Sequence, residues 1–196
     1  MNNRWIISPV VRATEKALLA VPALARLYMA PYKTVVQKEI KLAGLRPGER
    51  VLQIGAGSIP FSAIYLMKLA DVSVCAIDID RGAVRRAREW IRRLQLADRI
   101  QIEAGDGRSF PVHGFTAAFV ALQAEPKREI LAHLLRAGPD GFRIIARQPR
   151  KKFSSQYSMV PKNWQHQGEI KQPMITFSSS LLFTKNGVGA KPQPTG

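Results

Sequence analysis

The chain has 196 residues, 46% of them hydrophobic, which is typical of one globular α/β domain with a short extension. Lysines and arginines number 30 against 14 acidic residues, so the net charge of +16 excludes a charge-balanced surface. The single cysteine, Cys75, excludes an intrachain disulfide and indicates a reducing compartment. The histidines His113, His133 and His166 lie too far apart in the sequence for a metal-binding motif, so no metal site is predicted.

The first part of the chain is predicted to be helical. Its pattern favours helices over 9–29 and 32–43, with a break at Pro31 and an end at Gly44. The longest charge-free run after Lys16 in this part is too short to span a bilayer. We therefore predict no secretory signal and no membrane span, and we expect a soluble, cytoplasmic protein.

Strands and helices alternate in the rest of the chain. Strands are predicted over 51–54, 72–77, 100–104, 115–121 and 142–147. Helices are predicted over 59–69, from the N-cap Asp80 to Leu96, and over 126–137. A final pair of strands is expected over 169–171 and 178–184. This order predicts an α/β fold with a Rossmann-like, mostly parallel, seven-stranded sheet, an antiparallel last strand and helices on both faces.

The loops after the first three predicted strands indicate a ligand that contains adenosine. The first strand ends in Gly55 and Gly57, a turn that lets backbone N–H groups approach a ligand at a helix N-terminus. The second strand ends in Asp78, 23 residues after Gly55, where a carboxylate can accept both hydroxyls of a ribose. The third strand is followed by Asp106.

The details of the first loop favour S-adenosylmethionine over other nucleotides. A dinucleotide-binding loop needs a third glycine, and this chain has Pro60 there. A phosphate-binding P-loop needs Gly-Lys-Ser/Thr, which is absent from the sequence. S-adenosylmethionine has no pyrophosphate, so the loop only has to pass its methionine part. A dinucleotide enzyme and a fold with an empty site remain the alternatives.

Several segments resemble those of nicotianamine synthases, a branch of the class I S-adenosylmethionine-dependent methyltransferase fold. The loop Gly55-Ala56-Gly57-Ser58-Ile59-Pro60-Phe61-Ser62-Ala63-Ile64 resembles the family's Gly-x-Gly-Pro-Leu-Pro-Leu-Thr-x-Ile loop, with Ser58 in place of a proline. Further similar segments are Asp78-Ile79-Asp80, Ala121 to Arg128, Arg147, and Ser178 to Phe183. The first motif of the class usually has an acid where this chain has Gln53.

The resemblance implies an S-adenosylmethionine-dependent transferase that acts on a small molecule. Methyl transfer is narrowly favoured, because only about 45 residues precede the first predicted strand and the family has a larger helical domain there. The alternative is the family's own reaction, transfer of a 3-amino-3-carboxypropyl group to an amine, which gives a metallophore-type product. A further alternative is a protein that binds RNA or an anionic membrane and has a relic cofactor site.

The site residues follow from the loops and from the resemblance. The predicted cofactor-binding residues are Gln53, Gly55, Ala56, Gly57, Pro60, Asp78, Ile79, Gly105, Asp106, Gly107, Leu122 and Gln123. The acceptor amine must lose a proton, and a tyrosine or a carboxylate can take it. The candidates are Tyr28, Tyr32 and Glu39, because the second N-terminal helix should lie over the cofactor.

One predicted helix is unusually rich in arginine. It contains Arg81, Arg85, Arg86, Arg88, Arg92 and Arg93. This pattern indicates either a solvated helix face or an electrostatic surface for nucleic acid or anionic lipid, outside the cofactor site. No exposed aromatic residue is expected beside the arginines, because Trp90 is predicted to face the core.

The predicted organisation has three parts. A helical segment over 1–45 precedes the S-adenosylmethionine-binding domain over 46–186, and a disordered tail rich in Gly and Pro is expected over 187–196. The N-terminal segment has more apolar residues than one helix needs to cover a sheet, so a homodimer is plausible.

Overall fold

The computed structural model describes residues 22–161 and 163–186, with side chains described from residue 31 onwards. The helices are α2 (Pro22–Ala43), α3 (Phe61–Ala70), α4 (Arg81–Arg93), α5 (Lys127–Ala137) and the 3-10 helix η1 (Lys151–Phe153). The strands are β1 (Arg50–Ile54), β2 (Ser73–Asp78), β3 (Ile100–Ala104), β4 (Ala117–Val120), β5 (Arg143–Pro149), β6 (Gly168–Lys171) and β7 (Phe177–Thr184). Residues 9–21 of the helix predicted over 9–29, and the tail predicted over 187–196, lie outside the described residues.

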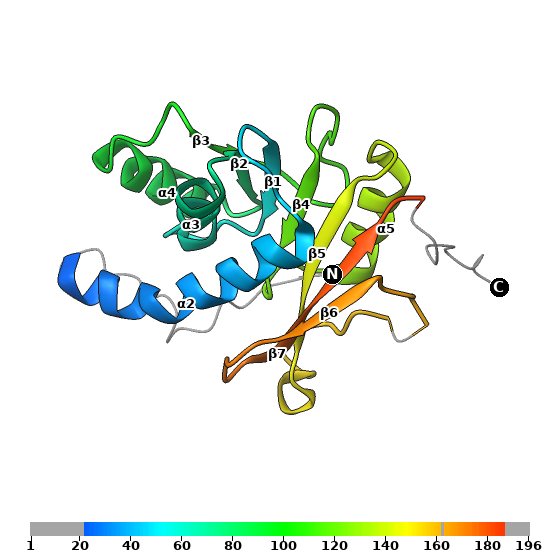
Figure 1. Cartoon of the computed structure of the whole chain (residues 1–196). Helices are drawn as coiled ribbons and strands as arrows, with labels where there is room; N and C mark the ends of the chain where they lie inside the picture. The colour runs from blue at the N-terminus through cyan, green and yellow to red at the C-terminus, as the bar shows by residue number, and fades with distance from the viewer. Residues whose placement is uncertain (1–21, 162, 187–196) are drawn as a thin grey trace, which may run out of the picture.

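The strands form one seven-stranded sheet in the order β3-β2-β1-β4-β5-β7-β6 (Figure 1). The pairs β3–β2, β2–β1, β1–β4 and β4–β5 are parallel, whereas β7 is antiparallel to both β5 and β6. The sheet therefore has the predicted class: α/β, mostly parallel, with an antiparallel last strand. The order reverses between β1 and β4, and ligands bind beyond the carboxyl ends of the strands at such a point.

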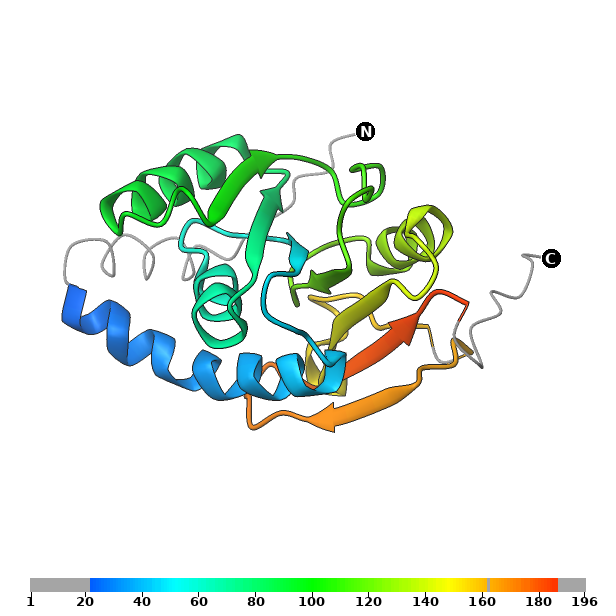
Figure 2. The same cartoon turned by 45° about the horizontal axis from the view of Figure 1, so that its top comes forward.

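The helices cover both faces of the sheet (Figure 2). Helices α2, α3 and α4 share one hydrophobic core with the sheet, to which they contribute Val36, Ile64 and Val84. Helix α5 packs on the other face, where Leu131 is fully buried in a second core. Neighbouring residues of β1 alternate between these cores, because successive strand side chains point to opposite faces.

The predicted break of the N-terminal helix at Pro31 is wrong. Helix α2 continues through Pro31 from Pro22 to Ala43. A proline removes one backbone hydrogen bond and crowds the preceding turn, yet a helix that is held by packing can tolerate this loss. Here Val35 and Val36, in the turn that follows the proline, are fully buried, so tertiary packing supports the helix on that side.

Other local predictions are confirmed. Gly44 ends α2 with a left-handed φ of 60°, and its N–H donates to Lys41 O. Asp80 caps α4, because its Oδ1 accepts a 2.7 Å hydrogen bond from Gly82 N. Within the described part of the chain, no helix is long and apolar enough to cross a membrane.

Candidate functional site

The loop after β1 is held in a tight turn by its two glycines. Gly55 and Gly57 have backbone φ angles of 85° and 65°, which residues other than glycine rarely adopt. A Cβ on Gly55 would also lie only 3.0 Å from Ala121 Cβ, so the loops after β1 and β4 touch there. The loop is also hydrogen-bonded to β2, since Gly55 N and Ala56 N both donate to Ile77 O at 2.9 Å.

Asp78 lies at the carboxyl end of β2 and orders the neighbouring loops. Its Oδ2 accepts a 2.8 Å hydrogen bond from Gly57 N, and its Oδ1 accepts one of 2.9 Å from Asp80 N. The carboxylate is only half-buried, so its remaining lone pairs can meet a ligand. The next side chain, Ile79, is 61% exposed and offers an apolar surface beside it.

The loop after β3 packs closely against the sheet. A Cβ on Gly107 would lie 2.7 Å from Ile54 Cγ2, and one on Gly105 would lie 2.7 Å from the Phe110 ring. The Asp106 carboxylate accepts hydrogen bonds from the backbone N and the guanidinium of Arg108, with Nη2 at 2.6 Å from Oδ2. These bonds lower the pKa of Asp106. Arg108 is therefore paired with the carboxylate that was expected to accept a hydrogen bond from the adenine amino group.

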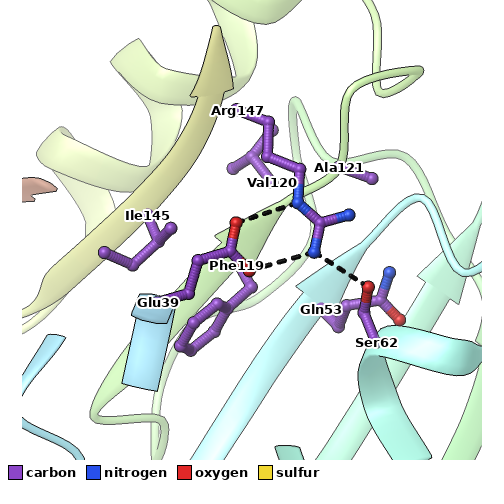
Figure 3. A pocket seen from close by; sticks show the side chains of 8 residues that line it. All are labelled: Glu39, Gln53, Ser62, Phe119, Val120, Ala121, Ile145 and Arg147. Carbon is purple, nitrogen blue, oxygen red and sulfur yellow. Dashed lines mark hydrogen bonds and ion pairs between the residues drawn. The ribbon is translucent and has the colours of Figure 1, made fainter. Parts of the chain in front are cut away.

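Gln53 presents a buried polar atom without a partner. Its Nε2 donates a 2.9 Å hydrogen bond to Gly55 O, whereas its Oε1 accepts none from the described residues. The side chain is 2% exposed and lines a small cavity under the carboxyl ends of β1, β4 and β5 (Figure 3). The cavity is lined by Glu39, Gln53, Ser62, Phe119, Val120, Ala121, Ile145 and Arg147. An unpartnered acceptor of this kind fits a ligand that brings a donor, such as an ammonium group.

A buried ion pair crosses the same cavity and joins α2 to β5. Arg147 Nε donates to Glu39 Oε1 and Arg147 Nη2 donates to Glu39 Oε2, both at 2.9 Å (Figure 3). Arg147 Nη2 also donates to Ser62 Oγ at 3.0 Å, and Ser180 Oγ donates to Glu39 Oε1 at 2.7 Å. Burial alone would lower the pKa of Arg147, but the Glu39 carboxylate outweighs it and raises that pKa. The guanidinium stays charged and fixed in this position.

The three candidate proton acceptors on α2 have different positions. Glu39 is 1% exposed, and both of its oxygens are engaged in the ion pair. Tyr32 is half-buried, with its ring centroid 5.9 Å from Arg147 Cζ and 6.1 Å from the Phe61 ring. Tyr28 lies on α2, but its side chain is outside the described part. The structure therefore brings Tyr32 and Glu39 together at one end of the sheet.

The two cofactor-binding residues predicted in the loop after β4 have different surroundings. Leu122 is buried in a small cluster with Val35 and Phe177, whereas Gln123 is exposed to solvent. The backbone of this loop accepts hydrogen bonds from a fully buried lysine, Lys127, whose role was not predicted from the sequence. Lys127 Nζ donates to Leu122 O at 2.9 Å and to Ala124 O at 3.3 Å.

A second unpredicted contact reaches the glycine loop from α4. Ser58 is 1% exposed, and its Oγ accepts a 2.8 Å hydrogen bond from Arg86 Nε. Arg86 Nη2 also lies 3.9 Å from Asp80 Oδ2. One arginine of α4 thus supports the loop, although the whole arginine-rich helix was expected to lie outside the site. The only signal in the sequence was a small polar residue where the similar family has proline.

Comparison with known sequences identifies related proteins. The family model described as "Nicotianamine synthase protein" matches residues 24–166. An L-histidine 2-aminobutanoyltransferase of Yersinia pestis is 35% identical over 74 residues, which are 38% of this chain and 28% of that protein. One of Pseudomonas aeruginosa is 30% identical over 89 residues, which are 45% of this chain and 34% of that protein. The chain matches about a third or less of the length of these curated relatives.

Comparison with solved structures supports the fold. A point mutant of MtNAS in complex with S-adenosylmethionine is 25% identical with a TM-score of 0.72, covering 83% of this chain and 65% of that one. MtNAS in complex with MTA and tNA is 24% identical with a TM-score of 0.76, covering 89% and 69%. An RNA methyltransferase from Salinibacter ruber in complex with S-adenosyl-L-homocysteine is 15% identical with a TM-score of 0.65, covering 83% and 95%. The last two matches show the fold alone.

Proposed function

Because the chain belongs to the nicotianamine synthase family, we propose that it binds S-adenosylmethionine and transfers its 3-amino-3-carboxypropyl group to an amine of a small acceptor. The resemblance predicted from the sequence is confirmed by the family match. The observation that best supports the reaction is the buried pair of Glu39 and Arg147, which fixes α2 at the cavity under the carboxyl ends of β1, β4 and β5.

The described residues fit this cofactor. The Gly55 to Pro60 loop would pass the methionine part, and the unpartnered Gln53 Oε1 could accept from its ammonium group. Asp78 would accept from the ribose hydroxyls, and the exposed side chain of Ile79 would cover one face of the adenine. Asp106 would accept from the adenine amino group once Arg108 releases it.

Two observations favour aminocarboxypropyl transfer over the methyl transfer that the sequence narrowly favoured. The sequence favoured methyl transfer because few residues precede the first strand, but α2 alone places Glu39 at the cavity and both Glu39 and Tyr32 beside Arg147. The curated relatives are named for a 2-aminobutanoyl transfer to histidine. Both observations point to the aminocarboxypropyl carbon as the one that the acceptor amine attacks.

The protein's own contribution is positioning and proton removal. The bound sulfonium supplies an electrophilic carbon, so alignment of the acceptor amine opposite the leaving sulfur provides much of the rate. Arg147 Nη1 makes no hydrogen bond to the described residues and would bind a carboxylate of the transferred group. With both Glu39 oxygens engaged by Arg147, Glu39 would position the guanidinium. Tyr32 is the better candidate to accept the proton of the amine.

The nucleoside product tests the proposal. The protein is incubated with S-adenosylmethionine and a panel of amines, beginning with L-histidine, and the nucleosides are identified by mass spectrometry. We expect 5′-methylthioadenosine above the level formed without protein, and the Asp78→Ala variant should form less. S-adenosylhomocysteine as the product would contradict the proposal and favour methyl transfer.

The proposed organisation of the chain is a helical segment over 1–45, a cofactor-binding domain over 46–186 and a tail over 187–196. A homodimer is also proposed, and size-exclusion chromatography with light scattering would test it.

A further inference from the structure

Four arginines form one stripe along the solvent side of α4. Arg81, Arg85, Arg88 and Arg92 are spaced by four, three and four residues, which places them on one face of a helix. All four are exposed, and from first to last they extend over about 16 Å of helix. We call these four residues the arginine stripe. Neither the cofactor site nor the proposed reaction uses it.

The opposite face of α4 is not available to a partner. Ala83, Val84, Ala87 and Ile91 are buried in the protein's own core. An amphipathic helix that binds a membrane inserts its apolar face among the lipids, which this packing prevents. A partner can therefore meet α4 only through its charged face.

The positive charge on this face is only partly neutralised within the described residues. Helix α4 has six arginines and one acidic residue, Glu89, whose carboxylate pairs with Arg92 and Arg93. Arg81 and Arg85 form no hydrogen bond or ion pair with the described part of the chain. Arg88 Nε donates to Ile102 O at 2.7 Å, and the residue remains exposed beside the edge strand β3. Asp80 lies beside the helix N-terminus but is engaged as the cap.

We propose that the arginine stripe binds the phosphodiester backbone of single-stranded nucleic acid. All basic residues of α4 are arginines, and the planar guanidinium binds phosphate oxygens through paired hydrogen bonds, whereas a lipid surface needs only net charge. Trp90, the helix's aromatic residue, packs on the core, so the described residues of this surface include no platform for stacking bases. Binding is therefore independent of base sequence. Because α4 lies flat on the sheet (Figure 2), it suits a flexible strand better than a duplex groove.

Salt-dependent binding of a labelled oligonucleotide tests this proposal. The probe is a fluorescein-labelled oligouridylate of about 20 nucleotides, followed by fluorescence anisotropy between about 50 and 200 mM salt. The test variant changes the arginine stripe to glutamine at all four positions, and Arg86 stays because it contacts Ser58. The control variant changes Arg46, Arg128, Arg136 and Lys171 to glutamine. These residues are also exposed but lie on other elements, so both variants lose the same net charge.

The expected result separates local contacts from net charge. Each phosphate contact to a single strand contributes about −0.7 to the slope of log K against log salt concentration, so the stripe variant should lose about 3 from that slope. Its affinity should fall at least about tenfold at low salt, while the control variant should lose much less. An oligothymidylate should bind like the oligouridylate, because only the backbone is contacted.

Three outcomes would overturn the proposal. Equal losses in the two variants would mean that net charge alone attracts the oligonucleotide. Absence of binding by the unmodified protein at about 100 mM salt would mean that the surface is only solvated. Binding to vesicles of phosphatidylcholine and phosphatidylserine that the stripe variant loses, with unchanged oligonucleotide binding, would assign the surface to lipid. Thermal melting of each variant verifies that a loss of binding is not a loss of fold.

Discussion

The Glu39 carboxylate and the Arg147 guanidinium form a bidentate ion pair that is buried between α2 and β5. The pair belongs to a larger network, since Ser62 accepts from Arg147 and Ser180 donates to Glu39. These hydrogen bonds engage both carboxylate oxygens of Glu39 and two of the three guanidinium nitrogens of Arg147 at a buried position. The network connects α2, helix α3 and strand β7 at one point beside the cavity that Gln53 lines.

Removing either partner of this pair should destabilise the protein more than removing both. Glu39→Gln or Arg147→Met leaves one buried charge without its partner, which costs about 3–5 kcal/mol, whereas the double variant leaves none. Urea unfolding of the four proteins measures the coupling free energy. The exposed residue Glu169 supplies the control, because Glu169→Gln should change stability by less than about 0.5 kcal/mol. Strictly additive losses would show that the pair does not act as a unit.

Asp78 should contribute strongly to S-adenosylmethionine binding. Loss of two charge-assisted hydrogen bonds to the ribose should cost about 1.5–3 kcal/mol, so Asp78→Ala should weaken binding at least about tenfold. Isothermal titration calorimetry measures the affinity, with Asp98→Ala, at an exposed position outside the site, as the control. Asp78→Asn keeps one acceptor for the loop amides and should bind better than the alanine variant. Equal affinity in all variants would remove Asp78 from the site.

Arg108 should compete with the cofactor for Asp106. The two side chains form an ion pair that is partly exposed and therefore worth up to about 1 kcal/mol, so Arg108→Gln should raise cofactor affinity by up to about fivefold. The same change should raise the pKa of Asp106 toward its ordinary value, because the hydrogen bonds from Arg108 are the main cause of its lowering. Arg99→Gln breaks an exposed pair with Asp71 elsewhere and is the control. A weaker affinity after Arg108→Gln would instead assign Arg108 to ligand binding.

Cys75 should be unreactive in the folded protein. Its thiol is buried in β2, and burial, together with the Glu103 carboxylate whose Oε1 lies 3.5 Å away, raises its pKa to about 12. At pH 8 the thiolate fraction is therefore about 10⁻⁴, and the thiolate is the reactive form. Ellman's reagent should modify the thiol rapidly in guanidinium and very slowly in buffer. Rapid modification in buffer would mean that β2 opens readily.

Much of the fold was predictable because its signals are local. The helix end at Gly44 depends on a left-handed φ that glycine adopts without strain, and the N-cap at Asp80 depends on a carboxylate beside free amides. The glycine turn and Asp78 were predictable because each lies at the carboxyl end of a buried strand. Parallel strands bring these ends to one edge of the sheet.

What sequence reasoning missed depends on contacts between distant segments. The continuity of α2 through Pro31 follows from tertiary packing, which outweighs the local preference for a break. The sequence marked Glu39 and Arg147 separately, but not that they pair across 108 positions. The burial of Lys127 was also hidden, because lysine is rarely buried and two of its partners are backbone carbonyls that have no sequence signal, although it also pairs with Glu125 at 3.5 Å.

The most direct test of the proposed reaction follows the fate of two labels on S-adenosylmethionine. One preparation has a radioactive carbon in the methyl group, and the other has it in the carboxyl group. After incubation with the protein and L-histidine, or another amine found to react, the modified acceptor is isolated and counted. We expect the carboxyl label to move to the acceptor while the methyl label stays on the nucleoside product. Methyl label on the acceptor, with the carboxyl label left on the nucleoside product, would contradict the proposed reaction.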